Sequence, residues 1–144
     1  IWVADHRWFA GGPELLFAAS VAALAEAAAD TVSSETGQVL GGAPWMITTL
    51  RRAQPGADGA VSAVGTLAGI LAAAAVAGLG VMALRVDTRL FRPAFAGAVF
   101  GLFFDSLLGA TLEKRGWLNN DAVNFLSTAS AAGFALSLMA TIAK

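Results

Sequence analysis

Long apolar stretches alternate with short polar ones along this chain. Four apolar segments run over residues 13–34, 61–84, 91–113 and 121–143, and each exceeds the roughly 20 residues that cross a bilayer as a helix. All four are rich in Ala, Gly and Leu with few β-branched runs, and an open sheet cannot satisfy its backbone polar groups in lipid. The pattern predicts an all-α integral membrane protein, a bundle of about four transmembrane helices.

Composition supports a multi-pass protein whose main partner is the lipid bilayer. The chain is 57% hydrophobic and 13% charged, whereas an ordinary soluble domain is about a quarter charged. A net charge of -1 argues against a nucleic-acid partner, and the lack of cysteine excludes disulfides and thiolate metal sites. Composition leaves the oligomeric state open.

The start of the chain indicates that more of the bundle precedes it. The first residue is Ile1 and not Met, and IWVADHRWFAGG has no signal-peptide pattern. We therefore expect that residues upstream are missing and that residues 1–144 form a single polytopic membrane domain. The family resemblance given below implies additional N-terminal helices, so that this domain is the C-terminal part of a larger helical bundle.

Small residues recur at helical spacing in two of the segments. Gly65 and Gly69 are four apart in the second segment, and Gly97 and Gly101 are four apart in the third. Such spacing lets helix backbones approach closely, so we expect these faces to pack against other helices.

Carboxylates occur in the same apolar segments. Glu26 and Asp30 are four apart in the first segment, and Asp105 continues the Gly97–Gly101 face of the third; Glu35 is expected just beyond the first helix. A lipid-facing charge costs several kcal/mol, so such groups usually face a bundle interior and have a partner. No Lys or Arg lies near these acids within the helical segments, so we expect a loop cation or a bound metal ion to neutralise them. The alternative is that the acids cap a helix end.

Alternating helices would collect most polar residues at one membrane face. The opposite face receives the chain ends with Arg85, Asp87, Arg89 and Arg92. The polar face receives the acids named above together with Arg51, Arg52, Asp58, Ser62, Thr66, Glu113, Lys114, Arg115, Asn120 and Asn124. Carboxylates can hold Mg²⁺ while phosphates supply its other ligands, and basic groups and backbone N–H groups can neutralise phosphate oxygens. Phosphoryl transfer needs little beyond this positioning.

Five blocks in order carry a family resemblance: ADTVSSETG, GGAPWMITTLRR, PGADGAVSAVGTLAG, FFDSLLGATLE and NNDAVNFLS. Over roughly residues 22–135 the chain resembles the integral membrane family called domain of unknown function 92, or transmembrane protein 19. Its best understood members are plant phytyl-phosphate kinases, which convert phytyl monophosphate to the diphosphate. The resemblance implies a nucleotide-dependent kinase of a polyprenyl or phytyl monophosphate.

A second, shorter resemblance concerns the first segment. Asp30, Ser33 and Gly37 read D-x-x-S-x-x-x-G, which is similar to the D-x-x-A-x-x-x-G element of CTP-dependent lipid kinases and CDP-lipid synthases. This similarity implies that Asp30 binds metal or nucleotide, that the segment Gly59–Gly65 lines the nucleotide phosphates, and that CTP is the co-substrate.

These patterns together predict the site. Asp30, Asp105 and Glu26 are the expected catalytic residues, and Asp30 and Asp105 the expected Mg²⁺ ligands. The expected nucleotide- and phosphate-binding residues are Ser33, Gly37, Arg51, Arg52, Gly59, Ser62, Gly65, Thr66, Lys114, Arg115, Asn120 and Asn124. Because nucleotide is cytosolic, the polar face is expected to face the cytoplasm of a prokaryotic cell membrane, although Arg85, Arg89 and Arg92 on the opposite face would favour the reverse.

Two other function classes fit the same residues. A small multi-pass transporter or permease also uses intramembrane acids and Gly-interrupted helices, but here the polar residues gather at one end and form no path across both leaflets. A nucleotidyltransferase resembling CDP-lipid synthases would use much the same site as the kinase.

Overall fold

The computed structural model describes residues 12–83 and 85–142 and has four long helices in that part of the chain. They are α1 (Gly12–Leu40), α2 (Ala63–Ala83), α3 (Phe91–Leu108) and α4 (Asn120–Ile142), and α3 is flanked by the short helices η1 (Thr88–Leu90) and η2 (Gly109–Glu113). Each of the four, taking α3 with its flanks, is long and apolar enough to cross a membrane. The predicted all-α fold class is confirmed.

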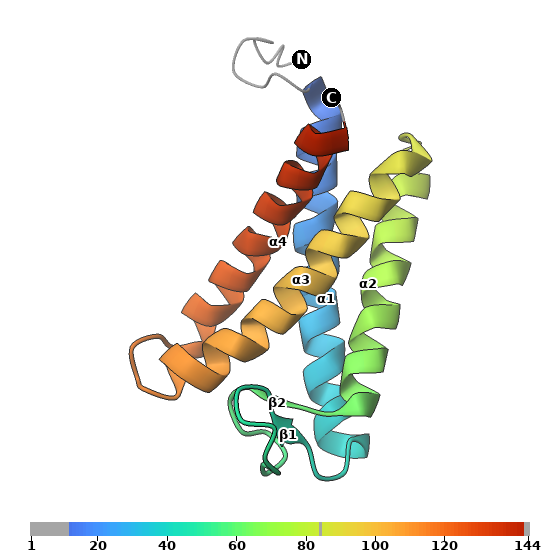
Figure 1. Ribbon diagram of the computed structural model, residues 1–144. Helices are drawn as coiled ribbons and strands as arrows, with labels where there is room; N and C mark the ends of the chain where they lie inside the picture. The colour runs from blue at the N-terminus through green and yellow to red at the C-terminus, as the bar shows by residue number, and fades with distance from the viewer. Residues whose placement is uncertain (1–11, 84, 143–144) are drawn as a thin grey trace.

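The helices run in alternating directions, with α1 packed against all three others (Figure 1). The end of α1, the start of α2, the end of α3 and the start of α4 lie together at one end of the bundle, beside the strands β1 (Trp45–Met46) and β2 (Ala60–Val61). We call this the pocket end. The opposite end holds the start of α1 and the α2–α3 connection, as the alternating topology predicted.

The first helix is longer than expected. It was predicted to end at residue 34, but α1 continues to Leu40, so Glu35 lies within the helix and not beyond it. Twenty-nine residues span about 43 Å at 1.5 Å per residue, whereas the hydrocarbon core is about 30 Å thick. We therefore expect the polar last turns to extend past the lipid. There a helix can continue without apolar residues, so the end of the apolar run did not mark the end of α1. The predicted ends of the second and fourth helices, residues 84 and 143, lie outside the described residues.

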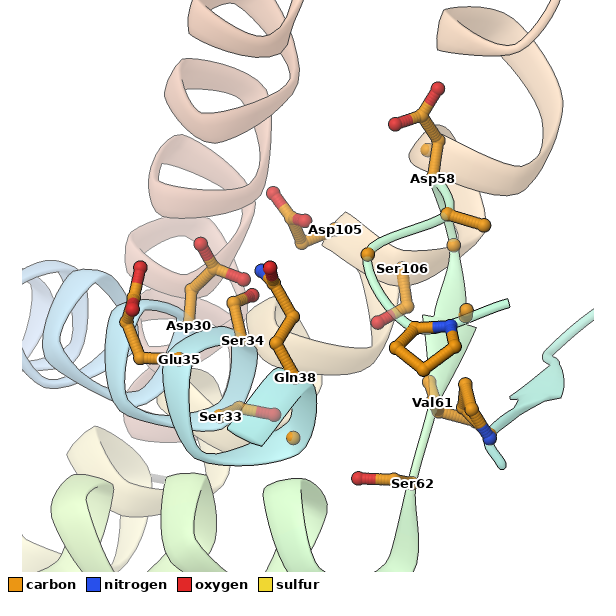
Figure 2. Close-up of a pocket in the computed structure, with 18 of the residues that line it drawn as sticks. Asp30, Ser33, Ser34, Glu35, Gln38, Asp58, Val61, Ser62, Asp105 and Ser106 are labelled. Atoms are coloured by element: carbon orange, nitrogen blue, oxygen red, sulfur yellow. The ribbon is translucent and has the colours of Figure 1, made fainter. Parts of the chain in front are cut away.

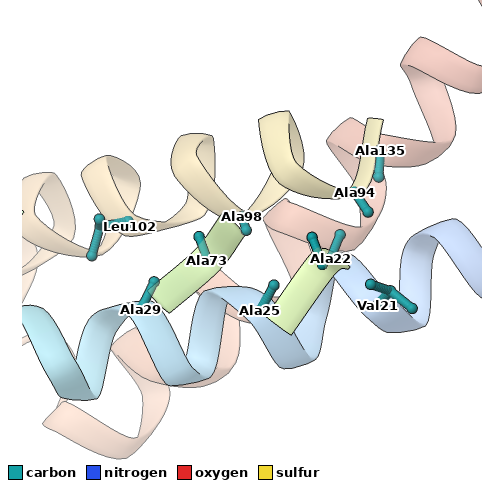
Figure 3. Close-up of a cluster of buried hydrophobic side chains, with 10 residues drawn as sticks. Val21, Ala22, Ala25, Ala29, Ala73, Ala94, Ala98, Leu102 and Ala135 are labelled. Carbon is teal, nitrogen blue, oxygen red and sulfur yellow. The ribbon is translucent and has the colours of Figure 1, made fainter. Parts of the chain in front are cut away.

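Small side chains form the centre of the bundle. Buried alanines from all four helices make up most of the core cluster (Figure 3), which comprises Val21, Ala22, Ala25, Ala29, Ala73, Ala77, Ala94, Ala98, Leu102 and Ala135. A Cβ atom placed on Gly69 would lie 2.9 Å from the carbonyl oxygen of Ala29, and one on Gly97 would lie 2.5 Å from that of Ala131. The close helix approach predicted from the spacing of these glycines is confirmed. Large apolar side chains such as Leu67, Leu71 and Phe125 point outward, where lipid would cover them.

The long segment between the first two helices is a compact hairpin. Strands β1 and β2 pair antiparallel, with Trp45 opposite Val61. Gly59 has φ +73°, which favours glycine, and a Cβ atom there would overlap the backbone of Ala110 in η2. The hairpin is thus held against the end of the third membrane helix, and this contact forms one wall of the site described next.

Candidate functional site

A polar pocket of about 330 Å³ opens at the pocket end, and this volume lies at the small end of the range for ligand sites. Figure 2 shows side chains from α1, α3 and the hairpin around it. Its lining comprises Asp30, Thr31, Ser33, Ser34, Glu35, Gly37, Gln38, Pro44, Pro55, Gly56, Ala57, Asp58, Gly59, Ala60, Val61, Ser62, Asp105, Ser106, Gly109, Glu113, Asn120 and Asn124.

Helical periodicity places the polar side chains on the pocket wall. In α1, Asp30, Ser34 and Gln38 are each four residues apart, so they form one face of the last turns, which Figure 2 shows together. The wall formed by the end of α3 continues into η2, which is a wide π-helical turn. In this turn the Lys114 N–H donates to the Gly109 carbonyl five residues earlier, at 3.1 Å. Such turns occur frequently at functional sites.

The pocket lining is acidic. Five carboxylates line it, from Asp30, Glu35, Asp58, Asp105 and Glu113, and the described lining includes no Lys or Arg. Within the described structure, Asp105 Oδ2 is buried and accepts no hydrogen bond. Buried carboxylate oxygens need a compensating partner, so this lining favours a bound cation over a bare anion.

Glu26 lies below the pocket and does not line it. Its side chain is 1% exposed, and its Oε2 atom accepts a hydrogen bond of 2.6 Å from the Thr128 hydroxyl. Its Oε1 atom has no partner among the described residues. A Cβ atom on Gly101 would lie 2.5 Å from Glu26 Cγ, so this glycine leaves the space that the glutamate occupies. Glu26 joins α1 to α4 beneath the site and is placed to support it from below.

The structure brings about half of the predicted site residues together. Those that line the pocket are Asp30, Ser33, Gly37, Gly59, Ser62, Asp105, Asn120 and Asn124. Those that do not are Glu26, Arg51, Arg52, Gly65, Thr66, Lys114 and Arg115. Gly65 packs against the Ser33 carbonyl, and its N–H donates to Ser62 Oγ at 3.0 Å. Ser62 therefore caps the first turn of α2, a structural task that the serine performs in addition to lining the pocket.

The four predicted phosphate-binding cations lie outside the pocket. The Arg52 guanidinium donates to the Ala43 carbonyl and lies 4.1 Å from the centre of the Trp45 ring. Arg115 lies 5.6 Å from the centre of the Trp117 ring. Arg51 and Lys114 are exposed. The basic groups thus flank the site and do not form its walls.

Sequence reasoning missed several polar residues of the lining. Gln38 and Ser106 line the pocket but were not singled out. For Gln38 the signal was available, because it continues the four-residue spacing of Asp30 and Ser34. It was missed because the helix was expected to end at residue 34. Asp58 and Glu113 had been assigned to the polar face without a role, and both line the pocket.

A metal held by protein groups alone is not indicated in the described part of the chain. No group of three or more His, Cys, Asp or Glu side chains there could hold a metal ion. Mg²⁺ usually needs less from the protein, because it binds through one or two carboxylates while phosphates and water supply the other ligands. Asp30 and Asp105, both of which line the pocket, fit that kind of site.

Comparison with known proteins gives one family and three relatives. The profile of the family described as "Integral membrane protein DUF92" matches residues 2–132. The chain is 39% identical over 108 residues to the uncharacterized membrane protein MJ0933 of Methanocaldococcus jannaschii, covering 75% of this chain and 45% of that protein. It is 38% identical over 124 residues to the uncharacterized membrane protein sll0875 of Synechocystis, covering 84% and 47%.

The third relative is a plant protein. Protein VTE6, chloroplastic, of Arabidopsis thaliana is 35% identical over 101 residues, which cover 68% of this chain and 30% of that protein. The chain therefore spans less than half the length of each of these relatives. No solved structure matches it.

Proposed function

The chain belongs to the DUF92 family of integral membrane proteins, and we propose that its pocket handles phosphate in a nucleotide-dependent kinase of an isoprenoid-lipid monophosphate. The product would be the lipid diphosphate, as in the plant phytyl-phosphate kinases that the sequence resembles. The observation that carries the proposal is the acid-lined pocket at one end of a lipid-exposed helix bundle.

The position of the pocket suits an amphiphilic substrate. Its walls include the last turns of α1 and the end of α3, which are helices with apolar outward faces. An isoprenoid chain can lie against those faces while its phosphate reaches the polar end, without the lipid leaving the bilayer. The volume of about 330 Å³ suits the phosphate groups of two substrates better than a whole lipid.

The acidic lining sets the condition under which phosphate can bind. Bare phosphate would be repelled by five carboxylates, but Asp30 and Asp105 would hold Mg²⁺, whose positive charge would offset that of the nucleotide phosphates. The Asn120 and Asn124 amides, which line the same pocket, would donate hydrogen bonds to phosphate oxygens. Ser33, Gly37 and residues 59–62, which line the same pocket, would contact the nucleotide.

The proposed reaction is a direct phosphoryl transfer. A terminal oxygen of the lipid monophosphate attacks the γ-phosphorus of the nucleotide, which we propose is CTP, and forms a new P–O bond. The bond between the γ-phosphorus and the β,γ-bridging oxygen breaks, and CDP leaves with the electron pair. The attacking oxygen is already anionic, so no general base is required, and positioning with charge neutralisation supplies the catalysis.

The interior below the pocket favours an enzyme over a permease. Apart from Glu26, Ser62 and Ser127, the buried residues of the described core are apolar or glycine, and alanine is the most frequent of them. A transport path needs polar groups at several depths. Nucleotidyl transfer remains the alternative that uses the same pocket, with attack at the α-phosphorus and loss of pyrophosphate.

One assay separates these reactions. The purified chain, reconstituted in lipid nanodiscs, is given Mg²⁺, phytyl phosphate and CTP labelled in the γ-phosphate, and the label is followed into phytyl diphosphate. Asp30→Asn and Asp105→Asn should each lower the rate at least about 100-fold, since losing even a supporting group of a metal site costs 10- to 100-fold. Asp121→Asn is the matched control, because this exposed acid lies in the first turn of α4 without lining the pocket. Pyrophosphate release would indicate nucleotidyl transfer. If no nucleotide gives product and Asp30→Asn leaves nucleotide binding unchanged, the proposal fails.

A further inference from the structure

Two Trp–Arg pairs flank the pocket at the same end of the bundle. Arg52 lies 4.1 Å from the Trp45 ring centre and Arg115 lies 5.6 Å from the Trp117 ring centre. All four side chains are exposed, and none of them lines the pocket. We propose that these two pairs form a membrane anchor that binds the headgroup layer of anionic phospholipids around the pocket mouth. We call them the Trp–Arg anchors.

The first anchor is held by a tight backbone turn. The Met46 N–H donates to the Arg51 carbonyl at 2.9 Å, the Leu50 N–H donates to the Met46 carbonyl at 2.8 Å, and the Ala53 N–H donates to the Pro44 carbonyl at 2.9 Å. Leu50 has φ 53°, which is uncommon for a residue other than glycine, and its side chain is 77% exposed. The turn therefore presents a large apolar side chain outward next to Arg51, an unfavourable arrangement in water.

The second anchor lies on the other side of the pocket, between α3 and α4. The Trp117 N–H donates to the Leu112 carbonyl at 3.0 Å, and Gly116 makes the turn with φ +72°. Trp117 is 70% exposed. Leu40, in the last turn of α1, is also exposed at this end. Exposed apolar side chains thus occur at the pocket end on three separate elements.

Bilayer headgroups are the occupant that matches this surface. The anchors continue the apolar outward faces of helices that are long enough to span a membrane, and Trp side chains are enriched at the level of lipid headgroups. Arg51, Arg52, Lys114 and Arg115 add four positive charges at the same level, and anionic lipids attract such residues. The acids, by contrast, line the pocket. The cations outside the pocket would attract anionic lipid phosphate to its mouth. The acidic pocket itself would accept phosphate only when a bound metal ion neutralises the carboxylates.

Depth-dependent fluorescence quenching tests the location of the anchors. Two proteins, each retaining only Trp45 or only Trp117 with the other tryptophans changed to Phe, are placed in nanodiscs of phosphatidylcholine and phosphatidylglycerol. Lipids brominated near the headgroup should quench each Trp more strongly than lipids brominated near the chain end. If bromolipids do not quench and aqueous acrylamide quenches as fully as it does free tryptophan, the anchors are in water and the proposal is overturned.

The charge of the lipid gives the second test. Brominated phosphatidylglycerol should quench both tryptophans more strongly than brominated phosphatidylcholine, with a local preference of about five-fold for each arginine. Arg52→Gln with Arg115→Gln should reduce that preference about five-fold for each arginine removed, while Arg51 and Lys114 keep part of it. Arg85→Gln with Arg92→Gln is the matched control, because both residues lie at the opposite end and should leave it unchanged. Equal quenching by both lipids in the unmodified protein, or a preference of unchanged size in the Arg52/Arg115 variant, contradicts the proposal. Neither readout involves nucleotide or a lipid substrate, so a failure here leaves the kinase proposal untouched.

Discussion

Replacing Gly101 by Ala should destabilise the bundle at the point where three helices meet. The new Cβ atom would lie 2.5 Å from Glu26 Cγ, 2.9 Å from Ala131 Cβ and 3.0 Å from the Ser127 carbonyl oxygen. Carbon atoms in contact normally stay about 3.5–4.0 Å apart, so the contact with Glu26 is about 1 Å too short. α1 and α4 close the space from different sides, so the methyl group has no direction in which to move. Overpacking of this kind costs about 1–3 kcal/mol.

Gly133→Ala is the matched control for Gly101→Ala. It makes the same change within α4, but a Cβ atom there would meet nothing within 4 Å. Unfolding of both variants in mixed micelles of dodecyl maltoside and SDS, followed by circular dichroism, gives their free energies of unfolding. Gly101→Ala should unfold at a lower SDS fraction than the unmodified protein, and Gly133→Ala should match it or be slightly more stable. Equal free energies for the two variants would refute the assignment of Gly101 as the space that Glu26 occupies.

Three further predictions concern the pocket and its support. Gly59→Ala should weaken nucleotide binding and speed hydrogen exchange in the hairpin, since its methyl group would overlap Ala110. Gly116→Ala is the control, because Gly116 has a similar positive φ without such a contact. This control should lower the free energy of unfolding by only about 1–2 kcal/mol. Thr128→Val should lower the free energy of unfolding by about 1–2 kcal/mol by removing the hydrogen bond to Glu26, and Thr128→Ser should restore it; equal loss in both would mean that packing matters and the hydroxyl does not. Chelation of Mg²⁺ with EDTA should abolish nucleotide binding in a filter assay and readdition should restore it; metal-independent binding would contradict the proposed roles of Asp30 and Asp105.

The helices and their alternation could be predicted because lipid makes the sequence pattern simple. A spanning segment must be long, apolar and helical, and four consecutive segments that each span fully must alternate in direction. The glycine spacing also predicted the close contacts of Gly69 and Gly97, since small residues at intervals of four fall on one helix face. The extension of α1 to Leu40 could not be read in this way. Past the bilayer, a helix is maintained by packing against α2 and the hairpin, and hydropathy carries no signal for that.

Prediction of the site succeeded where a residue is on a spanning helix and was weaker on loops. The four-residue ladder placed Asp105 on the same inward face as Gly101, and topology then brought it to the pocket with Asp30. The loop cations were selected by charge alone, and nothing in the sequence indicated that Arg52 and Arg115 would lie over Trp rings and outside the pocket. Loop direction depends on turn geometry such as the positive φ of Leu50 and Gly116, which local sequence specifies poorly.

The separation of charge at the pocket end bears on how a phosphate substrate would be selected. Acids line the pocket, and two arginines lie outside it beside tryptophans, which we propose contact the lipid headgroups. A lipid phosphate would therefore meet cations first and carboxylates second. Its entry into the pocket would be favourable only when a divalent metal neutralises the acids. A nucleotide arriving with Mg²⁺ already satisfies that condition, whereas a free phosphate does not. If the anchors attract anionic lipid as proposed, the same arrangement would keep the lipid headgroup out of the pocket until the metal–nucleotide complex is present. Entry of the acceptor would then be coupled to binding of the donor.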